Sequence, residues 1–178
     1  MTLPRPHAHA HAHAARRLAC LAALLALGAC SQAAKNPPAQ EIAADTACAL
    51  DGMMLQDFPG PKGQIQYVEG KPDFYCDLTE LFAVLLAPEQ KRQVGGLFVQ
   101  DMGKADWDHP RGNWIAAKTA LFVVGSRKSG SMGPTFGAFS TQAAADAFVH
   151  QQGGQVVRFE QVTAAMVNAR RAGAMHGA

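Results

Sequence analysis

The order of secondary-structure signals repeats once along the chain, and this repeat constrains the fold most strongly. Residues 64–75 alternate apolar and polar side chains around a Gly-Lys-Pro turn, which predicts a hairpin. A helix is predicted over residues 78–87, because Asp77-Leu-Thr-Glu80 matches a capping box ahead of the apolar run LFAVLL. Residues 96–100 predict a further strand.

The second half presents the same order about 60 residues later, an offset that suggests an internal duplication. Residues 119–124 and 136–139 predict two strands on either side of the glycine-rich turn GSRKSGSMGPT. Ser140 is expected to cap the helix TQAAADAFVHQQ, Gly153-Gly154 to end it, and QVVRFEQV to form the last strand. We therefore predict an α+β fold of two small tandem ββαβ half-domains.

The first 29 residues have the features of a lipoprotein signal peptide. A basic region ends at Arg16-Arg17, and the apolar run that follows is roughly 12 residues, short of the roughly 20 that span a bilayer. Leu27-Gly28-Ala29-Cys30 resembles a bacterial lipobox, so Cys30 is expected to be acylated and to anchor the mature protein in a membrane. Ser31 in place of Asp resembles the signal for transfer to the outer membrane, on the periplasmic side.

Composition is typical of a soluble globular protein, with 48% apolar and 17% charged residues. Loss of three signal-peptide arginines turns the formal net charge of +2 into −1, so nothing indicates nucleic-acid binding. The predicted organisation is a signal peptide (1–29), a lipidated cysteine and flexible tether (30–46), a first half (47–115), a second half (116–168) and a tail (169–178).

Removal of Cys20 and acylation of Cys30 leave Cys48 and Cys76 as the mature thiols. Two cysteines in an oxidising periplasm form a disulfide by default, and this pairing stays open beside metal binding. Cys76 is expected just before a helix N-terminus, where the helix dipole favours the thiolate of a ligand or of a reactive cysteine.

Methionines add thioether groups to the two thiols as candidate metal ligands, near Cys48 and in the second half of the chain. Thiolate and thioether ligands are soft and favour Cu(I). Met132 lies in SGSMGPT, where it completes no periodic apolar face, whereas Met53 and Met54 could equally fill gaps in a core. Asp51-Gly52 predicts a turn immediately after Cys48.

Motifs of common enzyme classes are missing from the sequence: it contains no P-loop, GxGxxG, HExxH, GxSxG or CxxC. A loop at 101–114 gathers tryptophan, histidine and acidic residues and is predicted to be a partner-docking face, since exposed aromatic residues often anchor interfaces.

The chain resembles the NosL family, the accessory lipoproteins of nitrous oxide reductase. The resemblance extends from about Cys48 to Val167 and rests on CALDGM, DFYCD, FVQDMGKADWDHP, GSMGPTFGAF and GGQVVRFEQV. It implies two ββαβ halves and a periplasmic Cu(I) chaperone that assists maturation of the reductase copper centre. The implied partners are nitrous oxide reductase and the ABC-type complex of the same system, and no catalytic turnover is implied.

Carried over residue by residue, the resemblance implies Cys48 and Met132 as the main copper ligands, with Asp51 or Met53 as a third. Some family members have a second cysteine where this chain has Asp51, so a two-thiolate CxxC site is not implied here. Two alternatives stay open. One is a disulfide-stabilised lipoprotein without metal; the other is an enzyme like the organomercury-cleaving lyases, which share a related fold and use two cysteines and an aspartate.

Overall fold

The computed structural model describes residues 37–89 and 92–176. The predicted signal peptide, the lipidation site at Cys30 and the first part of the tether lie outside the described residues. No helix in the described part of the chain has the length and apolar character needed to cross a membrane.

The first half of the chain forms a four-stranded antiparallel sheet, with one helix packed against it. The strand order is β2-β1-β3-β4, and Gln64 of the central strand pairs with Phe74 on one side and Phe98 on the other. The predicted hairpin is therefore confirmed. The elements are η2 (Leu55–Asp57), β1 (Gly63–Tyr67), β2 (Asp73–Tyr75), α2 (Leu78–Leu85), β3 (Val94–Gln100) and β4 (Trp114–Ala116).

Helix α2 begins where the capping motif predicts and ends earlier than predicted. The Asp77 carboxylate accepts a hydrogen bond from the Thr79 backbone N–H at 2.7 Å, which satisfies one of the free donors of the first turn. The helix ends at Leu85, ahead of Pro88, whose ring disfavours helical backbone in the residue before it.

The second half repeats this arrangement. Its main sheet has the order β8-β5-β9, which matches β2-β1-β3 in the first half, with the first strand of each unit at the centre. The predicted duplication of element order is thus confirmed at the level of topology. The elements are η3 (Ala117–Thr119), β5 (Leu121–Val124), β6 (Ser129–Gly130), β7 (Gly133–Pro134), β8 (Gly137–Phe139), α3 (Gln142–Gln152), β9 (Gln155–Arg158) and η4 (Phe159–Gln161).

Thr141, and not the predicted Ser140, caps α3. Its Oγ1 accepts a hydrogen bond from the Ala144 backbone N–H at 3.2 Å. The hydroxyl of Ser140 instead donates to the buried carboxylate of Asp101, a contact with the first half that the local sequence does not reveal. Gly153, with a φ of 74°, ends α3 as predicted.

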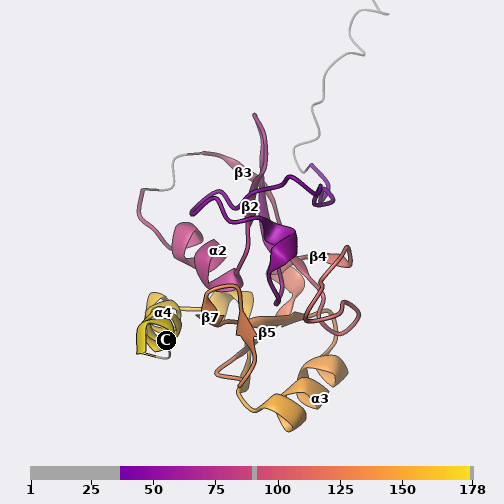
Figure 1. Cartoon of the computed structure of the whole chain (residues 1–178), viewed down its shortest axis with the longest axis vertical. Helices are drawn as coiled ribbons and strands as arrows, with labels where there is room; N and C mark the ends of the chain where they lie inside the picture. Colours follow the sequence, from indigo (N-terminus) through magenta and orange to yellow (C-terminus); the bar gives the residue numbers. More distant parts are fainter. Residues whose placement is uncertain (1–36, 90–91, 177–178) are drawn as a thin grey trace, which may run out of the picture. The chain divides into compact units, whose positions relative to one another are not determined.

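The segment predicted as a C-terminal tail is helical for most of its length, because α4 (Ala164–His176) extends through it. The Met166 backbone N–H donates to the Thr163 hydroxyl, and Val167 is buried in the core. The segment is rich in alanine and arginine, which favour helix, but only packing against α2 and β7 makes a surface helix of this kind stable. Figure 1 shows α4 beside both elements.

One apolar core joins the two halves. The ring of Phe82 in α2 lies 5.0 Å from that of Phe122 in β5 and 5.1 Å from that of Phe136, centroid to centroid. Helix α2 is therefore fixed against the second half as well as against its own sheet, and any site at its N-terminus has both halves as walls.

Ordered contacts also include part of the predicted tether. The Gln40 backbone N–H donates to Gln64 Oε1 at 2.8 Å, and Gln64 Nε2 donates to the Gln40 carbonyl oxygen at 2.9 Å. This reciprocal pair satisfies a buried polar side chain of β1, which explains why an apparently featureless segment is held against the sheet.

Candidate metal centre

Four side chains with metal-binding chemistry converge at the start of α2. The sulfur atoms of Cys48 and Cys76 and one carboxylate oxygen each from Asp51 and Glu80 lie within 4.8 Å of one another. Cys48, Cys76 and Glu80 are buried, whereas Asp51 is exposed. The cluster therefore has a buried inner side and one side open to solvent.

A tight turn directs Cys48 into this cluster. The Cys48 N–H donates to the Met53 carbonyl oxygen at 2.8 Å, and the Gly52 N–H donates to the Cys48 carbonyl oxygen at 3.0 Å. Gly52 has a φ of 78°, a conformation that glycine adopts readily, and Asp51 Oδ1 accepts from the Met53 N–H at 2.9 Å. The predicted Asp51-Gly52 turn is confirmed, and it places both the thiol and the carboxylate of this segment at the cluster.

Cys76 and Glu80 reach the cluster from the junction of β2 and α2. Cys76 directly follows the strand and precedes the N-cap Asp77, and Glu80 lies four residues later in the first turn of α2. Glu80 Oε2 lies 3.3 Å from Cys48 Sγ and 3.2 Å from Cys76 Sγ, hydrogen-bonding distances for sulfur. Both cysteines are free, so the structure describes a pair of reduced thiols and not the alternative disulfide.

Glu80 is a site residue that the sequence analysis missed. The capping-box interpretation assigns its carboxylate to the backbone at the helix start, but the structure directs it to the two thiols. The available signal was a carboxylate at Glu80 in the first turn of a predicted helix that begins just after Cys76.

The environment of the cluster distinguishes the two thiols. A hydrogen bond from Cys76 lowers the pKa of Cys48 to about 6, which favours the thiolate at this position. Sharing its proton with Cys48, together with burial, raises the pKa of Cys76, which is opposite to the effect expected from the helix dipole. Burial raises the pKa of Glu80 to about 8. At neutral pH the cluster therefore offers one thiolate beside two protonated neighbours.

A buried ammonium lies next to Cys76. Lys62 is 1% exposed, and its Nζ donates to the carbonyl oxygens of Phe58 at 2.8 Å, Pro59 at 2.9 Å and Cys76 at 3.1 Å. Burial lowers the pKa of Lys62 to about 8, which leaves it charged at neutral pH. Its positive charge offsets the negative charge of the Cys48 thiolate.

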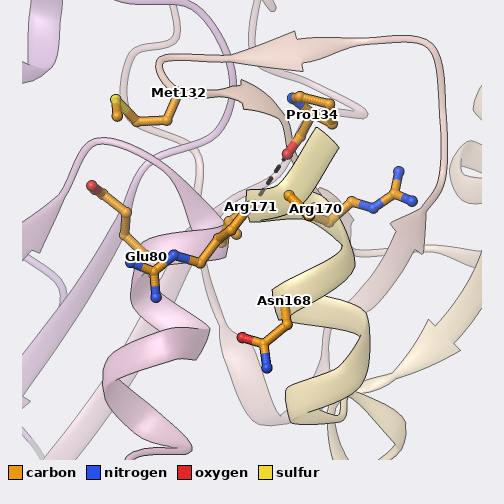
Figure 2. A pocket seen from close by; sticks show the side chains of 8 residues that line it. Glu80, Met132, Pro134, Asn168, Arg170 and Arg171 are labelled. Atoms are coloured by element: carbon orange, nitrogen blue, oxygen red, sulfur yellow. Dashed lines mark hydrogen bonds between the residues drawn. The ribbon is translucent and has the colours of Figure 1, made fainter. Parts of the chain in front are cut away.

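Met132 approaches this region from the second half of the chain. The predicted glycine-rich turn contains a small hairpin, and Met132 lies in the two-residue loop between β6 and β7, 47% exposed. Met132 and Glu80 line one cavity of about 490 Å³, whose other walls come from α2, β7 and α4. Figure 2 shows the thioether and the Glu80 carboxylate extending towards the same side of this cavity.

Short contacts connect the Met132 hairpin to the thiol cluster. Ser131 Oγ lies 3.1 Å from Cys76 Sγ and 3.0 Å from the Cys76 carbonyl oxygen. The Thr79 hydroxyl donates to the Pro134 carbonyl oxygen at 3.5 Å, the bond drawn dashed in Figure 2. Met53, by contrast, is half-buried in the Cys48 turn, to which its backbone contributes two hydrogen bonds.

The sequence and the fold of this chain are similar to those of known proteins. A copper-binding lipoprotein NosL of Achromobacter cycloclastes is 40% identical to this chain over 82% of the chain and 79% of the relative. A second protein of that name, from Stutzerimonas stutzeri, is 37% identical over 73% of the chain and 68% of the relative. The crystal structure of the copper chaperone NosL from Shewanella denitrificans matches with a TM-score of 0.69 and 41% identity, over 72% of this chain and 99% of that one. The NosL family model matches residues 38–167, and the chain therefore belongs to the NosL family.

Proposed function

We propose that this protein is a periplasmic, lipid-anchored chaperone that binds Cu(I) as its cargo. The observation that carries the proposal is a cluster of two buried, free thiols around Glu80, together with a cavity that Glu80 and the thioether of Met132 both line. Soft sulfur donors select Cu(I) over hard cations, whose sites are built from oxygen. The names of the relatives, copper-binding lipoprotein and copper chaperone, support the same cargo.

Cys48 and Met132 are the proposed principal ligands. The lowered pKa of Cys48 supports its role, because the thiolate is the form that binds metal and no proton has to be released at neutral pH. Cys76 is the proposed second thiol, next to Cys48 and hydrogen-bonded within the same cluster. Asp51 and Met53 belong to the same turn as Cys48 and are proposed as further donors from the open side.

The proposed role is delivery of copper for assembly of the copper centre of nitrous oxide reductase, with the reductase and the associated ABC-type complex as partners. Acyl chains on Cys30 would hold the protein at a membrane, which we propose to be the outer membrane. An exposed thioether supports delivery, because a donor at the surface can be replaced by a ligand of the partner while the buried thiol still holds the ion.

One alternative shares the same geometry. Two cysteines and an aspartate also serve the organomercury-cleaving lyases, and Cys48, Cys76 and Asp51 lie together here. The family membership favours the chaperone over this enzyme. Release of inorganic mercury from an alkylmercurial by the purified protein would establish the enzyme instead.

An anaerobic titration with Cu(I), combined with a count of reactive thiols, tests the proposed function. We expect two reactive thiols in the reduced protein, and loss of Cys48 reactivity after one equivalent of Cu(I). Protein prepared from the periplasm with a complete disulfide, and unable to take up Cu(I) before reduction, would support the metal-free alternative and remove the chaperone proposal.

A further inference from the structure

The hairpin that carries Met132 is too short to hold its own position. Strands β6 and β7 have two residues each, paired as Ser129 with Pro134 and Gly130 with Gly133. Isolated hairpins are at best marginally stable in water even when they are longer. The direction of the Met132 side chain therefore depends on contacts from outside the hairpin.

Trp107 provides the anchor on the strand that leads to Met132. Its indole Nε1–H donates to the Ser129 carbonyl oxygen at 2.9 Å. The ring itself is held in place, because it stacks on Phe148 of α3 with centroids 5.3 Å apart and planes 19° apart, and Lys128 Nζ lies 5.4 Å from its centre. Trp107 is therefore engaged within the molecule while remaining half-buried, and the prediction that the 101–114 loop is a partner-docking face stays a prediction.

The backbone of Trp107 fixes the neighbouring segment as well. Its carbonyl oxygen accepts a hydrogen bond from the Gly60 N–H at 2.8 Å. Gly60 in turn packs directly against the hairpin, since a Cβ atom added there would lie 2.8 Å from the Gly130 Cα. Trp107 thus holds the hairpin through its side chain and holds the surface beneath the hairpin through its main chain.

A second set of contacts holds the residues on both sides of Met132. The Thr135 hydroxyl donates to the buried Asp77 carboxylate at 2.6 Å, and Ser131 contacts Cys76. These contacts tie the hairpin to the thiol cluster, whereas Trp107 ties it to α3 and the 101–114 loop. With both sets of contacts in place, the position of the thioether relative to Cys48 is set before the metal arrives.

We propose that Trp107 is a positioning residue for the thioether of Met132, and that it contributes to Cu(I) affinity only through Met132. The inference rests on the proposed function, because it concerns a ligand of the same site. A donor on an ordered hairpin loses less conformational freedom on binding than a donor on a loose one. Removing the indole N–H should therefore weaken metal binding without touching any ligand.

A double-mutant cycle tests this inference. Trp107→Phe keeps an aromatic ring for stacking and removes the donor to Ser129. We expect Cu(I) affinity, measured by competition with a chromophoric chelator, to fall about fivefold, the fold-change of one ordinary hydrogen bond. In a Met132→Leu background the same substitution should change affinity by less than about twofold, because the thioether it positions is gone. Trp114→Phe is the matched control, since Trp114 Nε1 has no hydrogen-bond partner among the described residues.

The two proposals fail in different ways. If Met132→Leu alone leaves Cu(I) affinity unchanged, the proposed ligand set is wrong. If Met132→Leu weakens binding but Trp107→Phe acts equally in both backgrounds, or not at all, the positioning role is wrong.

A spectroscopic measurement keeps the test independent of whether Trp107→Phe folds well. Trp114→Phe leaves Trp107 as the sole tryptophan, so its indole N–H gives one resonance in an NMR spectrum. We expect that resonance to shift when Cu(I) binds, and the shift to disappear when Met132→Leu is added. If the chemical shift of this resonance does not change when Cu(I) binds, the inference is wrong.

Discussion

The two halves of the molecule share a strand order, yet they present their sulfur atoms differently. In the first half, Cys48 and Cys76 are 4% and 0% exposed and lie within hydrogen-bonding distance of Glu80. In the second half, Met132 is 47% exposed, in the loop of a hairpin whose strands have two residues each. One half surrounds its donors with protein, and the other presents its donor to solvent.

This difference explains how one fold can both retain a metal ion and release it. Buried donors that already share hydrogen bonds need little reordering when a metal binds, and few competitors can reach them. An exposed thioether can exchange with the donor of a partner protein. We infer that the first half supplies retention and the second half supplies access.

The helices of the two ββαβ units, α2 and α3, also differ in how much of their surface is buried. Helix α2 buries its first turn, including Glu80, between its own sheet and the aromatic core of the second half. Helix α3 buries only Ala145 among its residues and lies against one sheet. The helix that carries a site residue is thus the one that both halves hold in place.

The largest expected effect comes from breaking the buried half of the site. Cys48→Ser should lower Cu(I) affinity by more than the roughly 100-fold that loss of an outer partner costs a metal site, because it removes the thiolate itself. Cys76→Ser should cost about 10- to 100-fold, the range expected for a hydrogen-bonding neighbour of a ligand. Anaerobic competition titrations measure both. Equal losses for the two variants would show that the thiols are equivalent ligands, contrary to the asymmetry of their pKa values.

A change of pH sharpens the asymmetry between the two thiols. Because the pKa of Cys48 is lowered to about 6, protons compete with Cu(I) only below that value. We expect affinity to fall about tenfold per pH unit below pH 6, and far less steeply between pH 6 and 7.5. Cys76→Ala removes the hydrogen bond that lowers this pKa, so the fall should then begin at higher pH. An unchanged profile in that variant would contradict the proposed interaction between the thiols.

The smallest expected effect comes from the exposed half. Met132→Leu keeps the apolar volume and removes a neutral, exposed thioether, the weaker of the two proposed principal ligands, so we expect Cu(I) binding to weaken about tenfold, or about 1.4 kcal/mol. Met53→Leu is the comparison variant, because Met53 is the other proposed thioether donor and is half-buried in the Cys48 turn. Anaerobic competition titrations with Cu(I) at neutral pH measure the affinity of both variants. A larger loss for Met53→Leu than for Met132→Leu would move the proposed thioether to the first half.

Local signals predicted much of the fold. The Asp77 cap, the Asp51-Gly52 turn and the Gly153 helix end each depend on a few neighbouring residues, and all three are confirmed. The predicted helix cap at Ser140 was wrong, and helix α4 was not predicted, for one reason: tertiary contacts with Asp101 and with α2 decide them. A pattern in one segment carries no information about the residue that another segment brings against it.

The sequence by itself determined the residue types of the candidate site, the two ββαβ halves and the NosL resemblance, because these depend on composition, periodicity and short motifs. Only the tertiary structure decided that Cys76 and Glu80 join Cys48, and that Trp107 holds the hairpin of Met132. It also showed that the pKa of Cys48 is lowered and that of Cys76 raised, because the hydrogen bonds and burial that shift a pKa come from residues far apart in the chain. Sequence order cannot show these distances, since tertiary packing within the first half and between the two halves creates them.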